Sequence, residues 1–225
     1  MILKDSIILS FFILFLFFLI IKILSSLKKN TFLNYFSTPV IMLSIIMISL
    51  YNLKNNPENY NLFITSGLIL SIIGDMFNLI EKPDNSHLLY SIFFFFFTHI
   101  IYTLAFLIKY TFSLYHIFIL ILFIVLIIFI YSKFKININS NSMKIGIPIY
   151  MLVITITLII AIGNLNYKPI NKSLFIITGM FFFWLSDLFL GINAFIKKLK
   201  YSTVIIWVFY ASGQLLIGLS TYFYM

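Results

Sequence analysis

The chain has 225 residues, of which 62% are hydrophobic and 9% are charged, and its mean hydropathy is +1.11. Water-soluble domains of this length do not have such a composition, so the sequence indicates an integral membrane protein. It contains no cysteine, which excludes disulfides, thiolate metal sites and a cysteine nucleophile. The net charge is +9, and we attribute it to loop lysines near anionic lipid rather than to nucleic-acid binding.

A membrane-spanning helix needs about 20 mostly apolar residues. Eight segments meet or approach this length, at residues 6–27, 37–53, 61–80, 87–108, 113–131, 145–163, 173–194 and 201–224. No small-residue cleavage site follows the first, so we interpret it as a true span and not a signal peptide. Pro39 falls near the start of the second, where a proline is tolerated. We predict an all-α integral membrane protein with eight transmembrane helices in one membrane domain, residues 1–225.

Eight spans place both termini on one side of the membrane. That side has five lysines: Lys4, Lys54, Lys109, Lys168 and Lys172. The other side has ten: Lys22, Lys28, Lys29, Lys82, Lys133, Lys135, Lys144, Lys197, Lys198 and Lys200. Because lysine-rich loops stay in the cytoplasm, we predict a multi-pass protein of the plasma (inner) membrane with both termini outside.

Two aspartates lie deep within apolar segments, Asp75 in the third span and Asp187 in the seventh. A carboxylate inside such a segment is costly and is a functional candidate by default. The third and seventh helices run in the same direction, so both aspartates lie at similar depth, nearer the lysine-rich side. The offset of 112 residues between them also relates Gly67 to Gly179 and Tyr102 to Gln214. This offset is compatible with two parallel four-helix repeats.

Four predicted helices carry further polar or aromatic side chains at spacings of three or four residues, which places them on one face. The candidates for substrate binding are Ser71, Asn78, His99, Tyr102, Trp184, Ser186, Tyr210 and Gln214. We predict that the third, fourth, seventh and eighth helices line one polar pocket that both aspartates face. Each candidate also has a structural explanation, such as a serine bonded to its own helix or a glutamine that joins two helices.

Four motifs occur in chain order: GxxxSxxGD at 67–75, HxxY at 99–102, GxxxxxxSD at 179–187 and YxxGQ at 210–214. This ordered set resembles the YhhN-like lysoplasmalogenase family, and the similarity runs from Thr38 onward. The chain departs from the family pattern at Thr38, where a lysine is expected, and at Phe93, where a glycine is expected.

The resemblance implies a membrane hydrolase that cleaves the vinyl ether bond of lysoplasmalogens to a fatty aldehyde and a glycerophospho-base. Asp75 and Asp187 would share acid and base catalysis, as paired carboxyl groups do in glycosidases. The reaction implied needs no metal and no cofactor, and the partners are a lysophospholipid substrate and membrane lipid. The sequence carries no indication of the oligomeric state.

Other classes of protein also place acids inside membrane helices. A proton-coupled transporter would show broken helices near the acids. An intramembrane aspartyl protease would carry a GxGD motif, but Ile72 stands where its first glycine belongs. A non-catalytic lipid-binding protein is the third alternative.

Overall fold

The computed structural model describes the chain except for residues 1–4, 81–85, 109, 139, 166–169 and 224–225. The described residues form eight α-helices, and all eight are long and apolar enough to cross a membrane. They are α1 (Ser6–Leu27), α2 (Thr31–Asn55), α3 (Asn59–Leu79), α4 (Ser86–Leu107), α5 (Leu114–Phe134), α6 (Asn141–Ile162), α7 (Ile170–Phe195) and α8 (Ser202–Ser220). Short 3-10 turns follow α5, at Lys135–Asn137 (η2), and α8, at Thr221–Phe223 (η3). The predicted all-α protein with eight transmembrane helices is confirmed.

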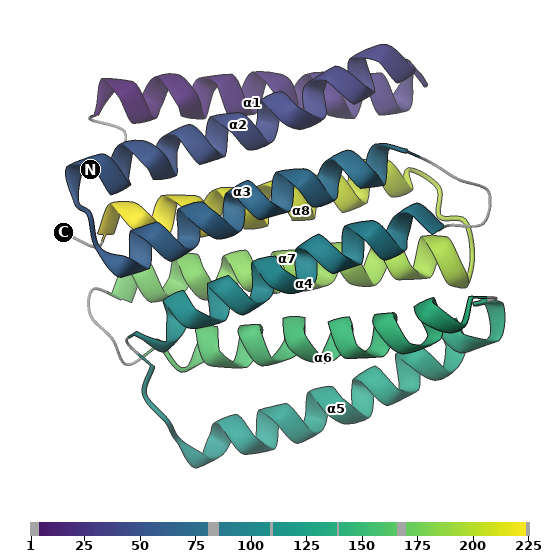
Figure 1. Cartoon of the computed structure of the whole chain (residues 1–225). Helices are drawn as coiled ribbons and strands as arrows, with labels where there is room; N and C mark the ends of the chain where they lie inside the picture. Colours follow the sequence, from purple (N-terminus) through teal and green to yellow (C-terminus); the bar gives the residue numbers. More distant parts are fainter. Residues whose placement is uncertain (1–4, 81–85, 109, 139, 166–169, 224–225) are drawn as a thin grey trace.

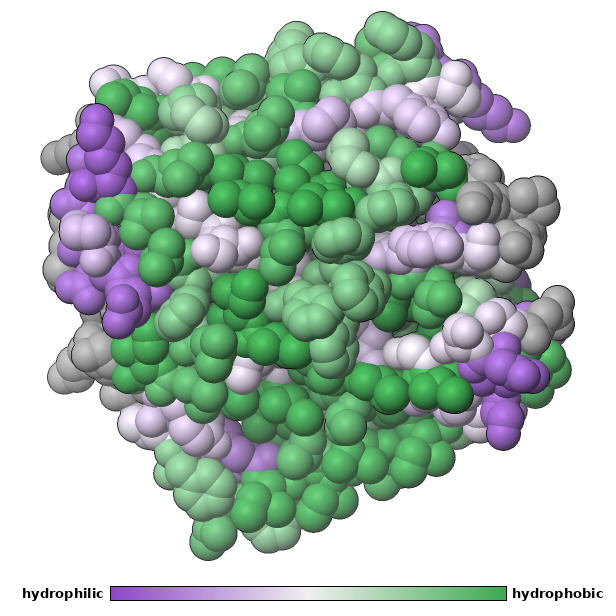
Figure 2. Space-filling model, viewed as in Figure 1, coloured by the Kyte–Doolittle hydropathy of each residue, from purple (hydrophilic) through white to green (hydrophobic). Residues whose placement is uncertain are grey.

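The helices run up and down through one bundle, and α1 begins at the same end at which α8 finishes (Figure 1). The pairs α1–α2, α3–α4 and α7–α8 pack most extensively, and α8 also contacts α1, α2 and α3. On the face shown in Figure 2, hydrophobic side chains cover the middle of the bundle and hydrophilic ones gather at its two ends. This distribution is the one expected when the middle of each helix faces the hydrocarbon of a bilayer.

The outermost helices are α1 and α5, which lie at opposite edges of the bundle in Figure 1. They are also the most apolar helices and the least buried ones. The helices with more polar residues lie between them, where other helices can satisfy those residues. Position in the bundle therefore follows composition, because lipid accepts apolar side chains and excludes unpaired polar groups.

The second helix begins earlier than predicted. Asn30 caps it by accepting a hydrogen bond from the backbone N–H of Leu33 at 3.0 Å, so α2 starts at Thr31 and not near residue 37. The prediction that Pro39 lies in the first turn is therefore wrong, since Pro39 is in the helix interior. Hydropathy alone does not locate this start, because the cap that sets it is a hydrogen bond made by the Asn30 side chain. In the same way α6 starts at Asn141, before the predicted residue 145.

One of the lysines is not a surface residue. Lys4, Lys82, Lys109 and Lys168 lie outside the described residues. Lys22, which the sequence analysis counts on the lysine-rich side, is buried inside the bundle with 1% of its surface exposed. It therefore does not contribute to the charge of that surface.

Close backbone contacts hold α7 against α8. A Cβ atom on Gly179 would lie 2.9 Å from the carbonyl oxygen of Gly213, and one on Gly213 would lie 2.7 Å from that of Gly179. Only residues without a side chain allow two membrane helices to approach so closely. Gly67 has the same role between α3 and α4, where a Cβ would meet the ring of Tyr102. Both glycines related by the 112-residue offset thus face the partner helix of their own pair.

Candidate active site

The two intramembrane aspartates lie toward the end of the bundle where α1, α3, α5 and α7 finish. Asp75 is four residues from the end of α3 and Asp187 is eight residues from the end of α7. At ~1.5 Å per residue both lie within the outer half of their helices, as the sequence predicts.

Asp75 is held in a chain of hydrogen bonds between helices. Its side chain is only 3% exposed, and Tyr210 Oη donates to its Oδ2 at 2.7 Å. Gln214 Nε2 donates to Tyr210 Oη at 3.3 Å, and Tyr102 Oη donates to Gln214 Oε1 at 2.8 Å. Three candidates from the fourth and eighth helices are therefore brought together behind Asp75.

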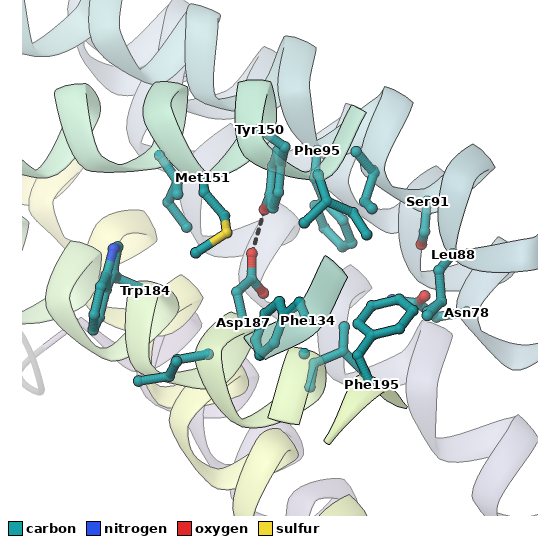
Figure 3. Close-up of a pocket in the computed structure, with 16 residues that line it drawn as sticks. Asn78, Leu88, Ser91, Phe95, Phe134, Tyr150, Met151, Trp184, Asp187 and Phe195 are labelled. Carbon is teal, nitrogen blue, oxygen red and sulfur yellow. Dashed lines mark hydrogen bonds between the residues drawn. The ribbon is translucent and has the colours of Figure 1, made fainter. Parts of the chain in front are cut away.

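Asp187 has different surroundings. Its carboxyl group is partly exposed to a cavity and accepts a hydrogen bond at Oδ2 from Tyr150 Oη on α6 (Figure 3). The cavity contains about 680 Å³ of empty space, including its mouth. Most of its lining residues are apolar. The full lining consists of Asn78, Leu88, Ser91, Ile92, Phe95, Phe134, Ile147, Tyr150, Met151, Ile154, Trp184, Asp187, Leu188, Leu190, Gly191 and Phe195.

This cavity differs from the predicted pocket in its walls and its polarity. Helices α5 and α6 contribute to the lining and α8 does not, and Asp75 is not one of the lining residues. The reason is packing: α6 lies against both α4 and α7, so Tyr150 of α6 and not a residue of α8 meets Asp187. The prediction that both aspartates face one polar pocket does not describe this cavity.

Aromatic rings stand between the cavity and Asp75. Phe95 lines the cavity, and its ring centroid lies 5.9 Å from that of Tyr210 and 5.7 Å from that of Phe183. The ring of His99 is 4.6 Å from Phe183 and 5.8 Å from Tyr150. Both nitrogens of His99 are buried without a hydrogen-bond partner among the described residues. His99 thus lies between the two aspartate environments and is bonded to neither.

The remaining candidate residues either line the cavity or form hydrogen bonds within the bundle. Asn78 and Trp184 line the cavity, and Trp184 Nε1 also donates to Thr155 Oγ1 at 3.1 Å. Ser71 donates to the carbonyl of Leu68 in its own helix at 2.8 Å, as a structural serine does. Ser186 donates to the carbonyl of Ile206 at 3.1 Å and so joins α7 to α8.

The sequence analysis did not select two buried side chains, Lys22 and Tyr150, and the second of these donates to Asp187. Nothing in the apolar segment around Tyr150 distinguishes it from a packing tyrosine. Lys22 carried a signal, since it is a charge in an apolar run. Its Nζ donates to Thr38 Oγ1 at 2.6 Å and to the carbonyl of Asn34 at 2.9 Å. The ammonium group therefore lies beside Thr38, the position where the family resemblance leads one to expect a lysine.

The described part of α3 and α7 is continuous through both aspartates, so the broken helices expected of a transporter are not found there. Across the residues with a described structure, no three His, Cys, Asp or Glu side chains come together in a way that could hold a metal ion.

The model of the YhhN family matches residues 33–221, which is most of the chain. No curated protein and no solved structure matches it.

Proposed function

Because the chain belongs to the YhhN family, we propose that it is a membrane hydrolase that cleaves the vinyl ether bond of lysoplasmalogens. The products would be a fatty aldehyde and a glycerophospho-base. The observation that carries this proposal is the pair of intramembrane carboxyl groups, one of which lies at an apolar cavity. Two carboxyl groups can supply both the acid and the base that this reaction needs.

Hydrolysis of a vinyl ether has two steps that need catalysis. Hydrolysis of a vinyl ether begins when a proton is delivered to the alkene carbon, which gives an oxocarbenium ion. Water must then be added to the carbon next to the oxygen, with loss of a proton to a base. Glycosidases meet a related demand with one carboxylic acid and one carboxylate. Two neighbouring carboxyl groups in a medium of low dielectric resist ionising together, so one retains its proton.

The shape of the cavity agrees with a lipid substrate. Its apolar lining can accommodate an alkyl chain. Most lining residues come from the second halves of α3, α5 and α7 and the first halves of α4 and α6, toward one end of the bundle. The lysines of the α5–α6 and α7–α8 connections lie at that end and would attract a phosphate group. For the vinyl ether to reach both aspartates, the Phe95 ring must turn aside.

The direct test uses detergent-purified protein and two substrates. One is a lysoplasmalogen, and the other is a matched lysophospholipid that lacks the vinyl ether. We expect fatty aldehyde from the first substrate and no hydrolysis of the second, and the activity should survive a metal chelator. A folded protein that releases no aldehyde would refute the proposal. Activity lost to a chelator and restored by zinc would show that the aspartates are metal ligands instead.

We further propose that the lysine-rich end of the bundle faces the cytoplasm of a plasma (inner) membrane, with both termini outside. The charge asymmetry supports this orientation even without Lys22. Reporter fusions after Asn55, after Asn141 and at the C-terminus measure it. A C-terminal reporter found in the cytoplasm would overturn the orientation.

A further inference from the structure

Asn78 is a polar side chain in a mostly apolar cavity, and its amide oxygen is unpaired. The residue lies on α3 one turn after Asp75 and lines the cavity. Its Oδ1 is buried without a hydrogen-bond partner among the described residues. A buried acceptor without a partner is unfavourable and is rare in folded proteins. The amide is therefore suited to a ligand that brings a hydrogen-bond donor into the cavity.

The hydroxyl groups that line the same cavity already have partners. Tyr150 donates to Asp187, and Ser91 donates to the backbone carbonyl of Gly74. An asparagine amide carries an acceptor and a donor, and a half-turn about its last bond exchanges the two. Asn78 can thus present its oxygen to the cavity without any movement of the α3 backbone.

The position of Asn78 along the cavity indicates which part of a lipid it would meet. In Figure 3, Asn78 and Ser91 lie at one end of the lining residues, Trp184 lies at the other end, and Asp187 lies between them. Asn78 is in the last turn of α3, whereas Trp184 is near the middle of α7. The Asn78 end of the cavity is therefore the lysine-rich end, and the Trp184 end is directed toward the centre of the bilayer.

A lipid with one chain matches this polarity in one direction. Its phosphate group would stay near the lysines, and its alkyl chain would extend toward Trp184. With the vinyl ether at the level of the aspartates, the glycerol lies between the vinyl ether and the phosphate. Asn78 follows Asp75 by three residues, which is ~4.5 Å along the helix toward the lysine-rich end. It therefore lies at the level of the glycerol, whose second carbon carries a free hydroxyl in a lysolipid.

We propose that Asn78 binds this free hydroxyl and so selects lipids with one chain against lipids with two. A hydroxyl can donate to Oδ1 of Asn78 and accept from its Nδ2. In a lipid with a second acyl chain an ester replaces the hydroxyl, has no hydrogen to donate and leaves the amide oxygen unpaired. The identity of the lipid rests on the proposed vinyl ether hydrolysis, but the contact itself can be measured without any reaction.

Other parts of the site cannot make this distinction. The lysines attract the phosphate group, which is the same in lipids with one chain and with two. The apolar lining contacts the first chain, which is also the same. A group that pairs with a substrate hydroxyl discriminates more strongly, because the analogue without the hydroxyl leaves that group buried and unpaired.

Two substrates that differ only at this hydroxyl test the contact. One is lysoplasmalogen, and the other is its deoxy analogue with a hydrogen in place of the hydroxyl. Wild-type kcat/KM should be about 10- to 100-fold higher for the first. Asn78→Leu, which is similar in size but lacks polar atoms, should abolish this preference by slowing the first substrate alone. Asn55→Leu, at the exposed end of α2, is the control and should keep the preference. Equal losses on both substrates in Asn78→Leu would assign Asn78 a structural role or a bound water only, and would overturn the proposal.

Binding of a lipid that cannot react separates this contact from the proposed reaction. The probe is a saturated 1-alkyl lysophospholipid with bromine on its alkyl chain, since bromine quenches tryptophan fluorescence on contact. The protein has two tryptophans, and Trp207→Phe leaves Trp184 as the reporter at the inner end of the cavity. Half-maximal quenching should need about 10- to 100-fold more of the deoxy probe than of the hydroxyl probe, and Asn78→Leu should remove that difference. Absence of saturable quenching, or equal affinity of the Trp207→Phe protein for both probes, overturns the proposal. If the probes bind as described but lysoplasmalogen yields no aldehyde, the Asn78 contact stands and the proposed reaction fails.

Discussion

Asp75 and Asp187 are the same residue in parallel helices at comparable depth, yet their surroundings differ in almost every respect. Asp75 is closed off and lies in a hydrogen-bonded chain through Tyr210 and Gln214. Asp187 opens to an apolar cavity and is bonded by Tyr150. The comparison teaches that sequence symmetry gives two carboxyl groups, whereas the neighbouring helices make them chemically unequal.

The source of the inequality is the asymmetry of the bundle. The pair α3–α4 packs beside α8, while α7 also contacts α5 and α6. Asp75 is therefore covered by α8, whose Tyr210 donates to its carboxyl group. Asp187 lies on the side where α5 and α6 leave a cavity. An acid and a base that must differ in protonation can be obtained in this way from two related segments.

The largest effect is expected from removing either carboxyl group. Asp75→Asn and Asp187→Asn should each reduce aldehyde release about 10²- to 10⁴-fold, because each removes one proton-transfer step. Asp5→Asn is the matched control, since Asp5 caps α1 at the far end of the bundle and asparagine also caps helices. The rates are measured by aldehyde trapping, and folding is checked by size-exclusion chromatography and thermal unfolding. If neither Asn variant at the site slows the reaction, acid–base catalysis by this pair is refuted.

The hydroxyl groups that bond the two aspartates provide a second comparison. Tyr210→Phe removes the hydroxyl that donates to the closed-off Asp75 and links it to Gln214, so it should reduce aldehyde release about 10- to 100-fold. Tyr150→Phe removes the hydroxyl that donates to Asp187, which the cavity leaves partly exposed, and should cost about 10-fold or less. Initial rates at saturating lipid distinguish the two variants. Equal losses, or a larger loss in Tyr150→Phe, would contradict the unequal surroundings of the two aspartates.

How far the sequence predicts this arrangement depends on the kind of information involved. Eight helices and two buried aspartates follow from hydropathy and from the cost of a charge in lipid, which act on each segment alone. Tyr102 of α4 donates a hydrogen bond to Gln214 of α8, in agreement with the prediction that the polar faces of the fourth and eighth helices meet. The position of the cavity cannot be predicted from the sequence, because its walls depend on how α5 and α6 pack. The apolar sequences of these two helices do not indicate which helices they contact. Tyr150 was missed for the same reason, whereas Lys22 could have been selected as a charge within an apolar run.

The distance between α7 and α8 depends on the close contact between Gly179 and Gly213. Gly179→Ala places a methyl group against the Gly213 carbonyl and should push α7 away from α8, at a cost of about 1–3 kcal/mol. The shift would also separate Asp187 from Tyr210 and slow aldehyde release. Gly146→Ala is the control, since its methyl would meet the Leu89 side chain at an ordinary 3.4 Å. Thermal unfolding in detergent measures both variants. An unchanged unfolding temperature in Gly179→Ala would show that the helices do not need this close approach.

Substitution of His99 is expected to have the smallest effect. It tests whether a side chain between Asp75 and Asp187 takes part in the reaction. Its ring packs against Phe183 and Tyr150, but neither of its nitrogens has a partner among the residues whose positions are described. His99→Phe keeps the ring contacts and removes two unpaired polar atoms, so stability should stay the same or rise. If His99 orients water between the aspartates during the reaction, aldehyde release should still fall, by about 10-fold or less. A loss as large as that of the Asp variants would make His99 itself an acid or a base. An unchanged rate would make it a packing residue and leave the two aspartates connected by the substrate alone.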